Sequence, residues 1–240
     1  MINKIDILVF AAHPDDAELG CSGTIMSHLA LGYSVAIIDM TFGELGTRGN
    51  IASRKAEANA ASKIMGIEMR ENLGLADGFF RKDKETLLQI IACIRKYQPQ
   101  IILSNAQEDR HVDHGRAADL IEEAAFLSGL QKIETIENGK AQLAWRPQQI
   151  YHYIQDRMTK PDVVFDISPF YDKKIESILA FKSQFYNPGS EEPETPISSP
   201  HFLKFIEGRA IEFGRIIGVQ YGEGFTVKRS IGASNLMALI

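Results

Sequence analysis

The sequence predicts an α/β fold: a mostly parallel sheet with helices on both of its faces. Short apolar stretches typical of buried strands alternate along the chain with longer stretches in which apolar residues recur at helical spacing. The chain has 240 residues, 45% of them hydrophobic and 24% charged, which suffices for one core of ordinary composition. Alternation of this kind makes each helix a crossover between parallel strands. We therefore expect a single Rossmann-like, doubly wound domain over residues 1–240.

Four predicted strands, each followed by a predicted helix, make up the first half of the chain. Residues 5–11 are almost all apolar, which is typical of a strand buried on both faces of a sheet. A glycine-rich loop at 42–49 precedes the second helix, and Pro99 ends the third. The third strand carries the weakest apolar signal. The predicted strands are residues 5–11, 35–38, 70–73 and 101–104, and the predicted helices are 18–31, 51–65, 84–97 and 114–127.

Two more strands and two more helices are predicted in the second half. The strands are expected at 149–154 and 163–166, and Pro169 suits the first turn of a helix that runs to about residue 184. Residues 186–200 contain four prolines together with glycine and acidic residues, so we expect a long loop there. The last helix is expected at 203–217. Neither an internal repeat nor an interdomain linker interrupts the pattern.

Composition excludes several classes of protein. The formal net charge of −5 leaves no basic stripe for a phosphate backbone, so we expect no nucleic-acid partner. No apolar run reaches the length of a membrane-spanning helix, and the first residues lack the sections of a signal peptide. We therefore expect a cytoplasmic protein without membrane contact. Cys21 and Cys93 lack metal-ligand spacing and are expected to be buried, reduced thiols.

Two polar clusters follow predicted strands. His13-Pro14-Asp15-Asp16 follows the first strand, and His111-Val112-Asp113-His114 comes shortly after the fourth. In a doubly wound sheet these two strands are neighbours at the point where the strand order reverses, and ligands bind at their carboxyl ends. Residues about a hundred positions apart in the sequence are thereby expected to meet in one crevice.

The residue types in the two clusters indicate a catalytic metal ion. Imidazole and carboxylate groups are the ligands of catalytic zinc, which takes three protein ligands and keeps one position for water. His13, Asp16 and His114 would make such a set. Two histidines and one carboxylate also suit Fe²⁺, so Zn²⁺ is the expected cofactor and Fe²⁺ the alternative.

The remaining residues of the clusters are candidates for acid–base chemistry. Asp15 is expected to take a proton from the metal-bound water as a general base. His111 is expected to donate a hydrogen bond to the oxyanion and to protonate the leaving group, with Asp113 holding it if their side chains meet. Either cluster alone is also explained by a turn with a helix cap, because aspartate accepts hydrogen bonds from free backbone amides there.

Longer stretches around both clusters resemble a known family. Residues 12–24, AHPDDAELGCSGT, resemble the first motif of the PIG-L/LmbE-like zinc deacetylases, and residues 111–114 resemble their second motif, H-x-D-H. Three further segments, 54–58, 72–78 and 218–225, resemble the branch of that family found in bacillithiol biosynthesis. The likeness therefore extends over nearly the whole chain.

The resemblance implies an LmbE-like fold, with residues 1–240 as one metal-dependent deacetylase domain. It implies hydrolysis of the N-acetyl group of a glucosamine conjugate, with N-acetylglucosaminyl L-malate as the substrate in bacillithiol biosynthesis. The partner would be this small amino-sugar conjugate, and relatives in the branch are often homo-oligomers. The resemblance assigns zinc binding to His13, Asp16 and His114, base catalysis to Asp15, an electrophilic or acid role to His111, and contacts with the sugar hydroxyls to Arg54 and Asp77.

Several residues near the clusters keep two interpretations. Arg110 can bind a substrate carboxylate bidentately or pair with an acidic neighbour on the surface. Apart from the resemblance, Arg54 is equally explained as a solvated helix charge and Asp77 as a turn residue. Some relatives carry a tyrosine before the last helix that assists the oxyanion, and here His201 stands nearby, which leaves that role open. Ordinary surface or packing roles are expected for His28 and His152.

Three alternatives to this function differ in what they require. One is a deacetylase of another N-acetylglucosamine conjugate or of a chitooligosaccharide. Another is a nucleotide-binding Rossmann-like module without hydrolase activity, but residues 13–16 stand where a phosphate cradle needs glycines. The third is a metal-bound phosphoesterase, which needs a second ion and more carboxylate ligands.

Overall fold

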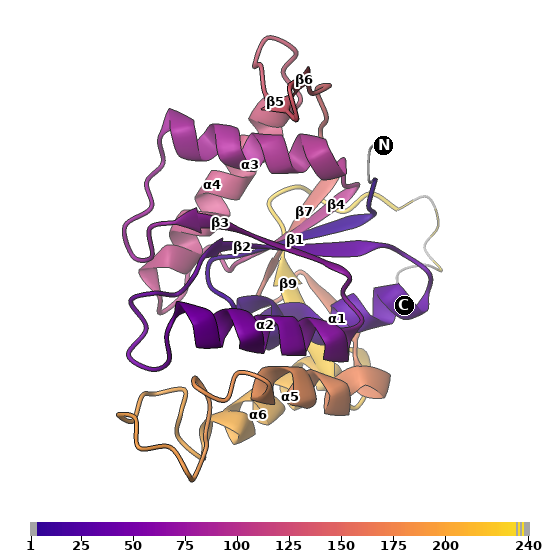
Figure 1. Cartoon of the computed structure of the whole chain (residues 1–240). Helices are drawn as coiled ribbons and strands as arrows, with labels where there is room; N and C mark the ends of the chain where they lie inside the picture. The colour runs from indigo at the N-terminus through magenta and orange to yellow at the C-terminus, as the bar shows by residue number, and fades with distance from the viewer. Residues whose placement is uncertain (1–3, 234, 236, 238–240) are drawn as a thin grey trace.

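Seven strands form one sheet in the computed structural model, which describes residues 4–233, 235 and 237 (Figure 1). Their order is β3-β2-β1-β4-β7-β9-β8; the first five run parallel, whereas β9 pairs antiparallel with both β7 and β8. β5 and β6 form a separate antiparallel pair. The strands are β1 (Ile7–Ala11), β2 (Val35–Thr41), β3 (Met69–Leu75), β4 (Ile101–Ser104), β5 (Ile136–Glu137), β6 (Lys140–Ala141), β7 (Gln149–Tyr153), β8 (Val163–Asp166) and β9 (Gly222–Thr226).

Helices cover both faces of the sheet, as the layers in Figure 1 show. α3 and α4 pack against one face, while α1, α2 and α5 lie on the other, with α6 beside β8 and β9. This is the doubly wound α/β architecture that the alternation of strands and helices predicts. The helices are α1 (Asp16–Ala30), α2 (Ile51–Met65), α3 (Lys84–Tyr97), α4 (Val112–Ser128), α5 (Tyr171–Leu179) and α6 (Phe202–Ile217).

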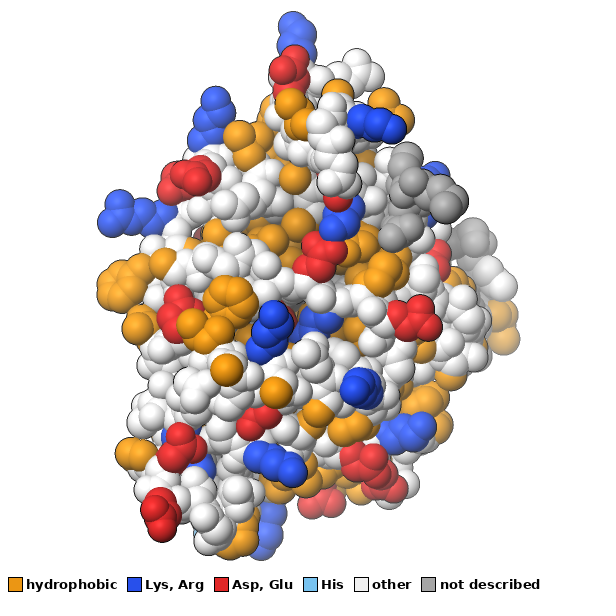
Figure 2. Space-filling view, viewed as in Figure 1, with side chains coloured by type: hydrophobic (Ala, Val, Ile, Leu, Met, Phe, Trp, Pro, Cys, Tyr) orange, Lys and Arg blue, Asp and Glu red, His pale blue; other side chains and the backbone are white. Residues whose placement is uncertain are grey.

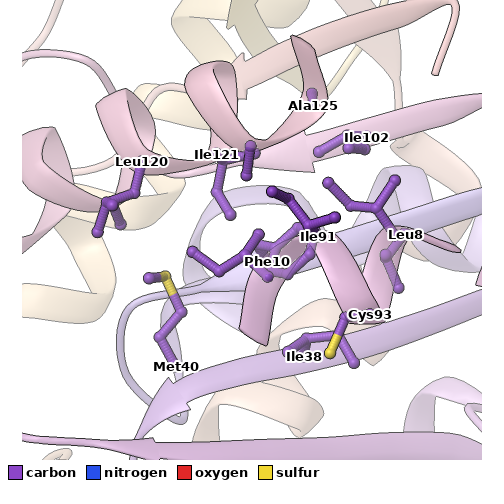
Figure 3. Close-up of a cluster of buried hydrophobic side chains, with 14 of the residues drawn as sticks. Leu8, Phe10, Ile38, Met40, Ile91, Cys93, Ile102, Leu120, Ile121 and Ala125 are labelled. Carbon is purple, nitrogen blue, oxygen red and sulfur yellow. The ribbon is translucent and has the colours of Figure 1, made fainter. Parts of the chain in front are cut away.

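β1 is apolar throughout because its alternate side chains enter two separate cores. Leu8 and Phe10 of β1 pack with Ile91 of α3 and Ile121 of α4 (Figure 3). Val9 of the same strand points to the opposite core, which α1 and α2 help to cover. A strand whose side chains enter cores on both faces of the sheet needs an unbroken apolar sequence.

Close packing fixes α1 against the sheet. A Cβ atom on Gly20 would lie 2.2 Å from the ring of Tyr153, so this position requires glycine. The Tyr153 hydroxyl donates a hydrogen bond of 2.9 Å to the carbonyl oxygen of Phe10 in β1. Tyr153 of β7 therefore contacts both β1 and α1 and keeps the three elements close together.

The structure confirms the predicted fold class and corrects three details. β9 is missing from the predicted elements, because its sequence GEGFT carries two glycines and only one large apolar residue. It forms a strand since it pairs with both β7 and β8. The β5–β6 hairpin is also missing from the prediction. The helix expected at 169–184 is shorter: a 3₁₀ turn at Ser168–Phe170 precedes α5, which ends at Leu179.

The charged side chains on the surface are mixed in sign, as the near-balanced composition predicts. On the face shown in Figure 2, Lys and Arg side chains are interspersed with Asp and Glu and with apolar side chains. The described residues on that face form no continuous basic stripe. Among the residues that the structure describes, no helix combines the length and the apolar character needed to cross a membrane.

Candidate active site

The first polar cluster occupies the sharp turn between β1 and α1. The backbone N–H of Asp16 donates to the carbonyl oxygen of His13 over 3.2 Å and closes the turn. Asp15, the residue before the helix, has a φ of 124°, which residues other than glycine rarely adopt. Both aspartates are buried, with 5% and 3% of their surface exposed. The chain thus holds two adjacent carboxylates in the interior on a strained backbone.

The second polar cluster reaches the same place from β4. β1 and β4 pair in parallel, with Ile7 opposite Ile101, so the loops that follow them leave from the same edge of the sheet. His114 Nε2 lies 3.1 Å from Asp16 Oδ1, and the ring centroids of His13 and His114 are 5.6 Å apart. The structure therefore brings together the three residues expected to bind a metal.

The donor atoms of this cluster fit a divalent metal ion. Ring nitrogens of His13, His111 and His114 lie within 4.8 Å of one another, and Asp16 adds carboxylate oxygens beside two of these rings. A set of imidazole nitrogens and one carboxylate is the ligand chemistry of catalytic zinc and of Fe²⁺. The residues present could therefore hold a divalent metal ion.

Carboxylates orient both imidazoles of the expected ligand set. His114 Nδ1 lies 2.5 Å from Asp109 Oδ2, which leaves Nε2 facing Asp16. His13 Nε2 lies 3.0 Å from Asp77 Oδ1 and 3.3 Å from Asp113 Oδ2, which leaves Nδ1 on the side of Asp16. A carboxylate on the far nitrogen fixes the tautomer of a metal-binding histidine and its ring orientation.

Amide groups hold the carboxylate of Asp16. Its Oδ2 accepts hydrogen bonds from the His13 backbone N–H and from Asn105 Nδ2, both over 2.9 Å. Its Oδ1 accepts one of 2.9 Å from Gln155 Nε2, and Gln155 Oε1 in turn accepts from Asn105. The side chain is therefore fixed before any ion binds.

Charge in the cluster favours a cation. Burial lowers the pKa of His114, but the carboxylates of Asp16 and Asp109 outweigh it and raise the pKa to about 9. Burial also opposes protonation of His13, yet the surrounding carboxylates raise its pKa well above the ordinary value. Protons on the two imidazoles offset the carboxylate charge in the metal-free protein. A bound cation would replace those protons.

Asp15 remains outside the expected ligand set and has its own partner. Arg54 Nη2 lies 3.0 Å from Asp15 Oδ2. Burial and the charge of Asp16 raise the pKa of Asp15 to about 7, although Arg54 opposes the shift. Gly43, in the glycine-rich loop, leaves room for the guanidinium, since a Cβ there would lie 2.2 Å from Arg54 Nη1. A carboxylate with a pKa near neutrality suits general-base catalysis.

His111 lies beside the same cluster as a neutral imidazole. Its Nδ1 accepts a hydrogen bond of 3.3 Å from the backbone N–H of Asp113, so we assign its proton to Nε2. Burial and the positive charges of His13 and His114 lower its pKa. The ring centroid of His111 is 4.6 Å from that of His13. His111 thus has the position and the protonation state of a hydrogen-bond donor to a reacting oxygen.

The Asp113 carboxylate does not make the contact with the His111 ring that the sequence predicts. Asp113 Oδ2 instead accepts from the backbone N–H of Gly78 and faces His13 Nε2, while Oδ1 pairs with Arg116 Nη1 over 2.5 Å. Asp113 follows His111 by two residues at the start of α4, and this spacing turns its backbone N–H, and not its side chain, toward the ring. Asp113 therefore supports His13.

The residues expected to contact the sugar are engaged within the protein. Arg54 is buried against Asp15, as described above. Asp77 Oδ1 faces His13, and Asp77 Oδ2 accepts a hydrogen bond of 2.9 Å from the backbone N–H of Leu45. Burial would raise the pKa of Asp77, but these bonds lower it to about 2. Both residues still line the cavity.

Arg110 and His201 differ in how they relate to the site. The Arg110 side chain is 51% exposed at the cavity, and its Nε lies 3.3 Å from Asp156 Oδ2, so it pairs with an acidic neighbour. His201 is exposed and is not among the residues that line the cavity. The position of His201 therefore gives no support to an oxyanion role. His152 is a buried packing residue, bonded to Glu122 and to the Asn105 carbonyl oxygen.

A cavity of about 460 Å³ opens over the cluster. It has room for a small amino-sugar conjugate of the size expected from the sequence. The segments that enclose it include the β1–α1 turn, the glycine-rich loop, the loop after β3, the start of α4, the residues after β7 and the segment from Thr195 into α6. Apolar side chains at its opening include Leu45, Phe79, Val112 and Phe205.

Sequence reasoning did not identify four residues that position the cluster, namely Asn105, Asp109, Gln155 and Arg116. Asn105 directly follows β4, and Gln155 comes two residues after β7. Polar residues just beyond the carboxyl ends of neighbouring parallel strands are the signal that would have indicated both. Asp109 precedes the second cluster by two residues, where an acidic residue alone says nothing of its partner.

Comparison with known proteins supports one family. The family model for GlcNAc-PI de-N-acetylase, PIG-L, matches residues 8–125, which include both polar clusters. The crystal structure of a conserved protein from Thermus thermophilus has a TM-score of 0.84 and 31% sequence identity, covering 95% of this chain and 97% of that one.

Two curated relatives have different activities in their names. Diacetylchitobiose deacetylase of Thermococcus kodakarensis is 26% identical over 228 residues, which cover 91% of this chain and 81% of the relative. The 4-oxalmesaconate hydratase of Pseudomonas putida is 28% identical over 193 residues, covering 74% of this chain and 73% of the relative. The two relatives thus differ in the reaction that their names give: one is a deacetylase and the other a hydratase.

Proposed function

The chain belongs to the PIG-L family, and from that premise we propose that it is a metal-dependent deacetylase of an N-acetylglucosamine conjugate. One observation carries the proposal. His13, Asp16 and His114 meet at one point of the cavity, and the buried carboxylate of Asp15 lies next to them without belonging to the expected ligand set. Hydrolysis of an amide needs an activated water and a base beside it. The arrangement supplies places for both.

His13, Asp16 and His114 would hold the ion, and Asp109, Asp77 and Asp113 would orient the two imidazoles. When bound, a Zn²⁺ or Fe²⁺ ion supplies Lewis acidity and lowers the pKa of its water ligand. Asp15 takes one proton from the water while the water oxygen forms a bond to the acetyl carbonyl carbon. The raised pKa of Asp15 lets the same carboxyl group release that proton later.

The rest of the reaction uses His111 and Asp15. His111 Nε2–H donates to the carbonyl oxygen as that oxygen gains negative charge. The carbon–nitrogen bond then breaks, the nitrogen takes the proton from Asp15, and the products are the free amine and acetate. Its lowered pKa leaves His111 neutral near pH 7, without an imidazolium proton to give, whereas Asp15 holds the proton taken from the water, so we assign the acid step to Asp15.

For the substrate, we propose N-acetylglucosaminyl L-malate, as the resemblance of three segments to the bacillithiol branch suggests. The cavity supports an anionic aglycone because Arg48, Arg54, Arg110 and Arg209 are among its lining residues. A neutral chitooligosaccharide would offer no anionic group to these arginines. We further propose that the chain acts as a homo-oligomer, as relatives in that branch often do.

The test is acetate release by the purified protein. We expect protein stripped with chelator to be inactive and to recover on addition of Zn²⁺ or Fe²⁺, with the malate conjugate preferred over N,N'-diacetylchitobiose. His114→Ala should lose metal and activity together, because it removes one of three ligands. His201→Ala, an exposed histidine outside the cavity, is the matched control and should behave as wild type. Acetate release that survives both the chelator and His114→Ala would refute the proposal.

The hydratase relative supports a second candidate function, the addition of water to an unsaturated carboxylate. The water oxygen would form a bond to one carbon of a carbon–carbon double bond, Asp15 would take the water proton and pass it to the other carbon, and the arginines would bind the carboxylates. We therefore include 4-oxalmesaconate in the panel. Consumption of 4-oxalmesaconate, with no acetate released from any glucosamine conjugate, would replace the deacetylase proposal with this one.

A further inference from the structure

Four arginines line the cavity, and three of them already have carboxylate partners. Arg54 pairs with Asp15 at 3.0 Å. Arg110 lies 3.3 Å from Asp156, and Arg48 lies 3.5 Å from Glu192 with a further hydrogen bond to Ser190. The fourth is Arg209 of α6, which has no carboxylate oxygen within 4.0 Å among residues 4–233, 235 and 237.

Arg209 is buried, with only 7% of its surface exposed. Within the described part of the chain, its side chain makes one hydrogen bond, from Nη2 to the carbonyl oxygen of Leu19 over 3.3 Å. The guanidinium also lies 5.4 Å from the ring centroid of Phe205. Burial lowers the pKa of Arg209 to about 10, so the group stays charged at neutral pH. An arginine buried in this way is costly unless an anion joins it.

The nearest acidic groups cannot supply that anion. Glu223 is bonded to Lys174 and to the backbone of α1, and Asp109 is bonded to His114 and to two backbone N–H groups. Asp156 faces Arg110. The described residues therefore supply no anion that pairs with Arg209.

The position of Arg209 relates it to the proposed reaction. Its partner Leu19 lies three residues after Asp16 on α1, which is less than one helical turn from a proposed metal ligand. The apolar side chains of Ile206 and Phe205 line the same part of the cavity. A charge next to such groups is poorly solvated and binds an anion more strongly than one in water.

We propose that Arg209 binds an oxyanion carried by the aglycone of the substrate, a carboxylate or a phosphate. The inference rests on the proposed function and names the substrate class of that site: amino-sugar conjugates with an anionic aglycone. Arg209 acts as a specificity-determining residue, because the planar guanidinium donates two parallel hydrogen bonds to a carboxylate or phosphate and has nothing to donate to in a neutral glycoside.

The kinetic test compares an anionic with a neutral substrate. We measure kcat/KM for N-acetylglucosaminyl L-malate and for methyl N-acetyl-α-glucosaminide with wild type and Arg209→Gln. Loss of a charge-assisted hydrogen bond predicts a decrease of about 10-fold to 100-fold for the malate conjugate and a change within about 2-fold for the methyl glycoside. Arg215→Gln is the matched control, since Arg215 lies on the same helix but is exposed and paired with Glu212.

A binding test gives a second readout that needs no turnover. L-malate and inorganic phosphate are titrated separately into wild type, Arg209→Gln, Arg209→Lys and Arg215→Gln, with thermal unfolding of each variant. We expect the weakest binding in Arg209→Gln, intermediate binding in Arg209→Lys, which keeps the charge, and wild-type binding in Arg215→Gln. The ligand with the larger loss identifies the source of the oxyanion.

The outcomes separate this proposal from the proposed function. A chain that releases no acetate from either substrate but loses malate or phosphate binding in Arg209→Gln would keep the anion site without the deacetylase. Equal losses of kcat/KM on both substrates, together with a lowered Tm in Arg209→Gln and in Arg209→Lys, would show a merely structural arginine. Unchanged binding of both anions and unchanged substrate preference would overturn the proposal as well.

Discussion

His114 Nδ1 lies 2.5 Å from Asp109 Oδ2, while its other ring nitrogen lies 3.1 Å from Asp16 Oδ1. The side chain of Asp109 is completely buried, and its second oxygen accepts backbone N–H groups from residues 156 and 157. The Asp109 carboxylate, which is itself fixed, therefore holds the His114 ring at Nδ1. Because the far nitrogen is occupied, Nε2 is the atom of His114 that faces the cluster.

Replacing Asp109 should weaken metal binding without removing a ligand. Loss of such a supporting carboxylate typically costs about 10-fold to 100-fold in metal affinity. We expect Asp109→Asn to raise the Kd for Zn²⁺ by that factor, measured by competition with a chelator of known affinity. Asp119→Asn, an exposed aspartate on α4, should leave the Kd unchanged. An unaltered Kd in Asp109→Asn would show that Asp109 does not orient His114.

Asp15 combines a chemical role with an unfavourable backbone conformation, and the two effects can be measured separately. Asp15→Asn should lower kcat by about 100-fold to 10,000-fold while the metal content stays at the wild-type value, because the base is lost and the ligands remain. The test is kcat together with metal analysis of the same preparation. Loss of the metal in Asp15→Asn would make Asp15 a ligand and contradict the role proposed here.

The strain at Asp15 predicts an order of stability among its variants. A φ of 124° costs a residue with a side chain about 1–3 kcal/mol relative to glycine. We therefore expect metal-free Asp15→Gly to unfold at a higher urea concentration than metal-free Asp15→Ala. Both variants lose the same carboxylate, so the comparison isolates the backbone. Equal midpoints would mean that the turn relaxes to another conformation.

Much of this site follows from patterns that the sequence shows directly. The apolar run before His13 and the one before residue 104 predict neighbouring parallel strands, and topology then brings their carboxyl ends together. The expected metal ligands are also chosen from the sequence, because the two clusters contain the residue types that metals select. Local periodicity and one topological rule are sufficient for these conclusions.

The partners of the side chains require coordinates. Asp113 is expected beside His111 because the two are close in the sequence, yet its carboxylate faces His13, which is 100 residues away. Which way a side chain leaves the start of a helix depends on backbone angles and on packing, and residue spacing does not determine either. β9 escapes prediction for a related reason: its strand conformation depends on pairing with β7 and β8 and not on its own composition.

The protonation of His114 predicts opposite effects of pH on the metal-free and the metal-bound protein. Its pKa is about 9 in the folded state and 6.5 ordinarily, so its contribution to folding is complete below pH 6.5 and disappears as the pH rises to 9. The loss amounts to about 3 kcal/mol at most. We expect the Tm of protein in chelator to fall over this interval.

Zinc should reverse that trend, because the ion competes with protons for the same nitrogen. The difference in Tm between protein with Zn²⁺ and protein with chelator should therefore grow from pH 6.5 to pH 9. Scanning calorimetry at half-unit steps measures both series. In His114→Gln the decrease in the chelator series should be smaller, and what remains comes from His13, whose pKa is also raised. A constant difference across the interval would exclude proton competition at His114.

A buried ion pair behind the site predicts a large loss of stability when one partner is removed. Lys174 is 2% exposed, and its Nζ lies 2.7 Å from Glu223 Oε1 and donates to the carbonyl oxygens of Glu18 and Leu19. Glu223 also accepts the backbone N–H groups of residues 23 and 24, just after the break in α1, where Cys21 has non-helical angles. The pair therefore joins α5 and β9 to the helix that begins at Asp16.

Lys174→Met should destabilise the protein by about 3–5 kcal/mol, because it leaves the Glu223 carboxylate buried without a cation. Lys174→Met combined with Glu223→Gln should recover part of this loss, since the double variant removes the uncompensated charge. Urea unfolding of the two single variants and the double variant gives the coupling energy as a thermodynamic cycle. Lys173→Met, the exposed neighbour on the same helix, should change stability by no more than about 0.5 kcal/mol. Additive losses in the double variant would show that Lys174 acts through its bonds to the α1 carbonyl oxygens and not through Glu223.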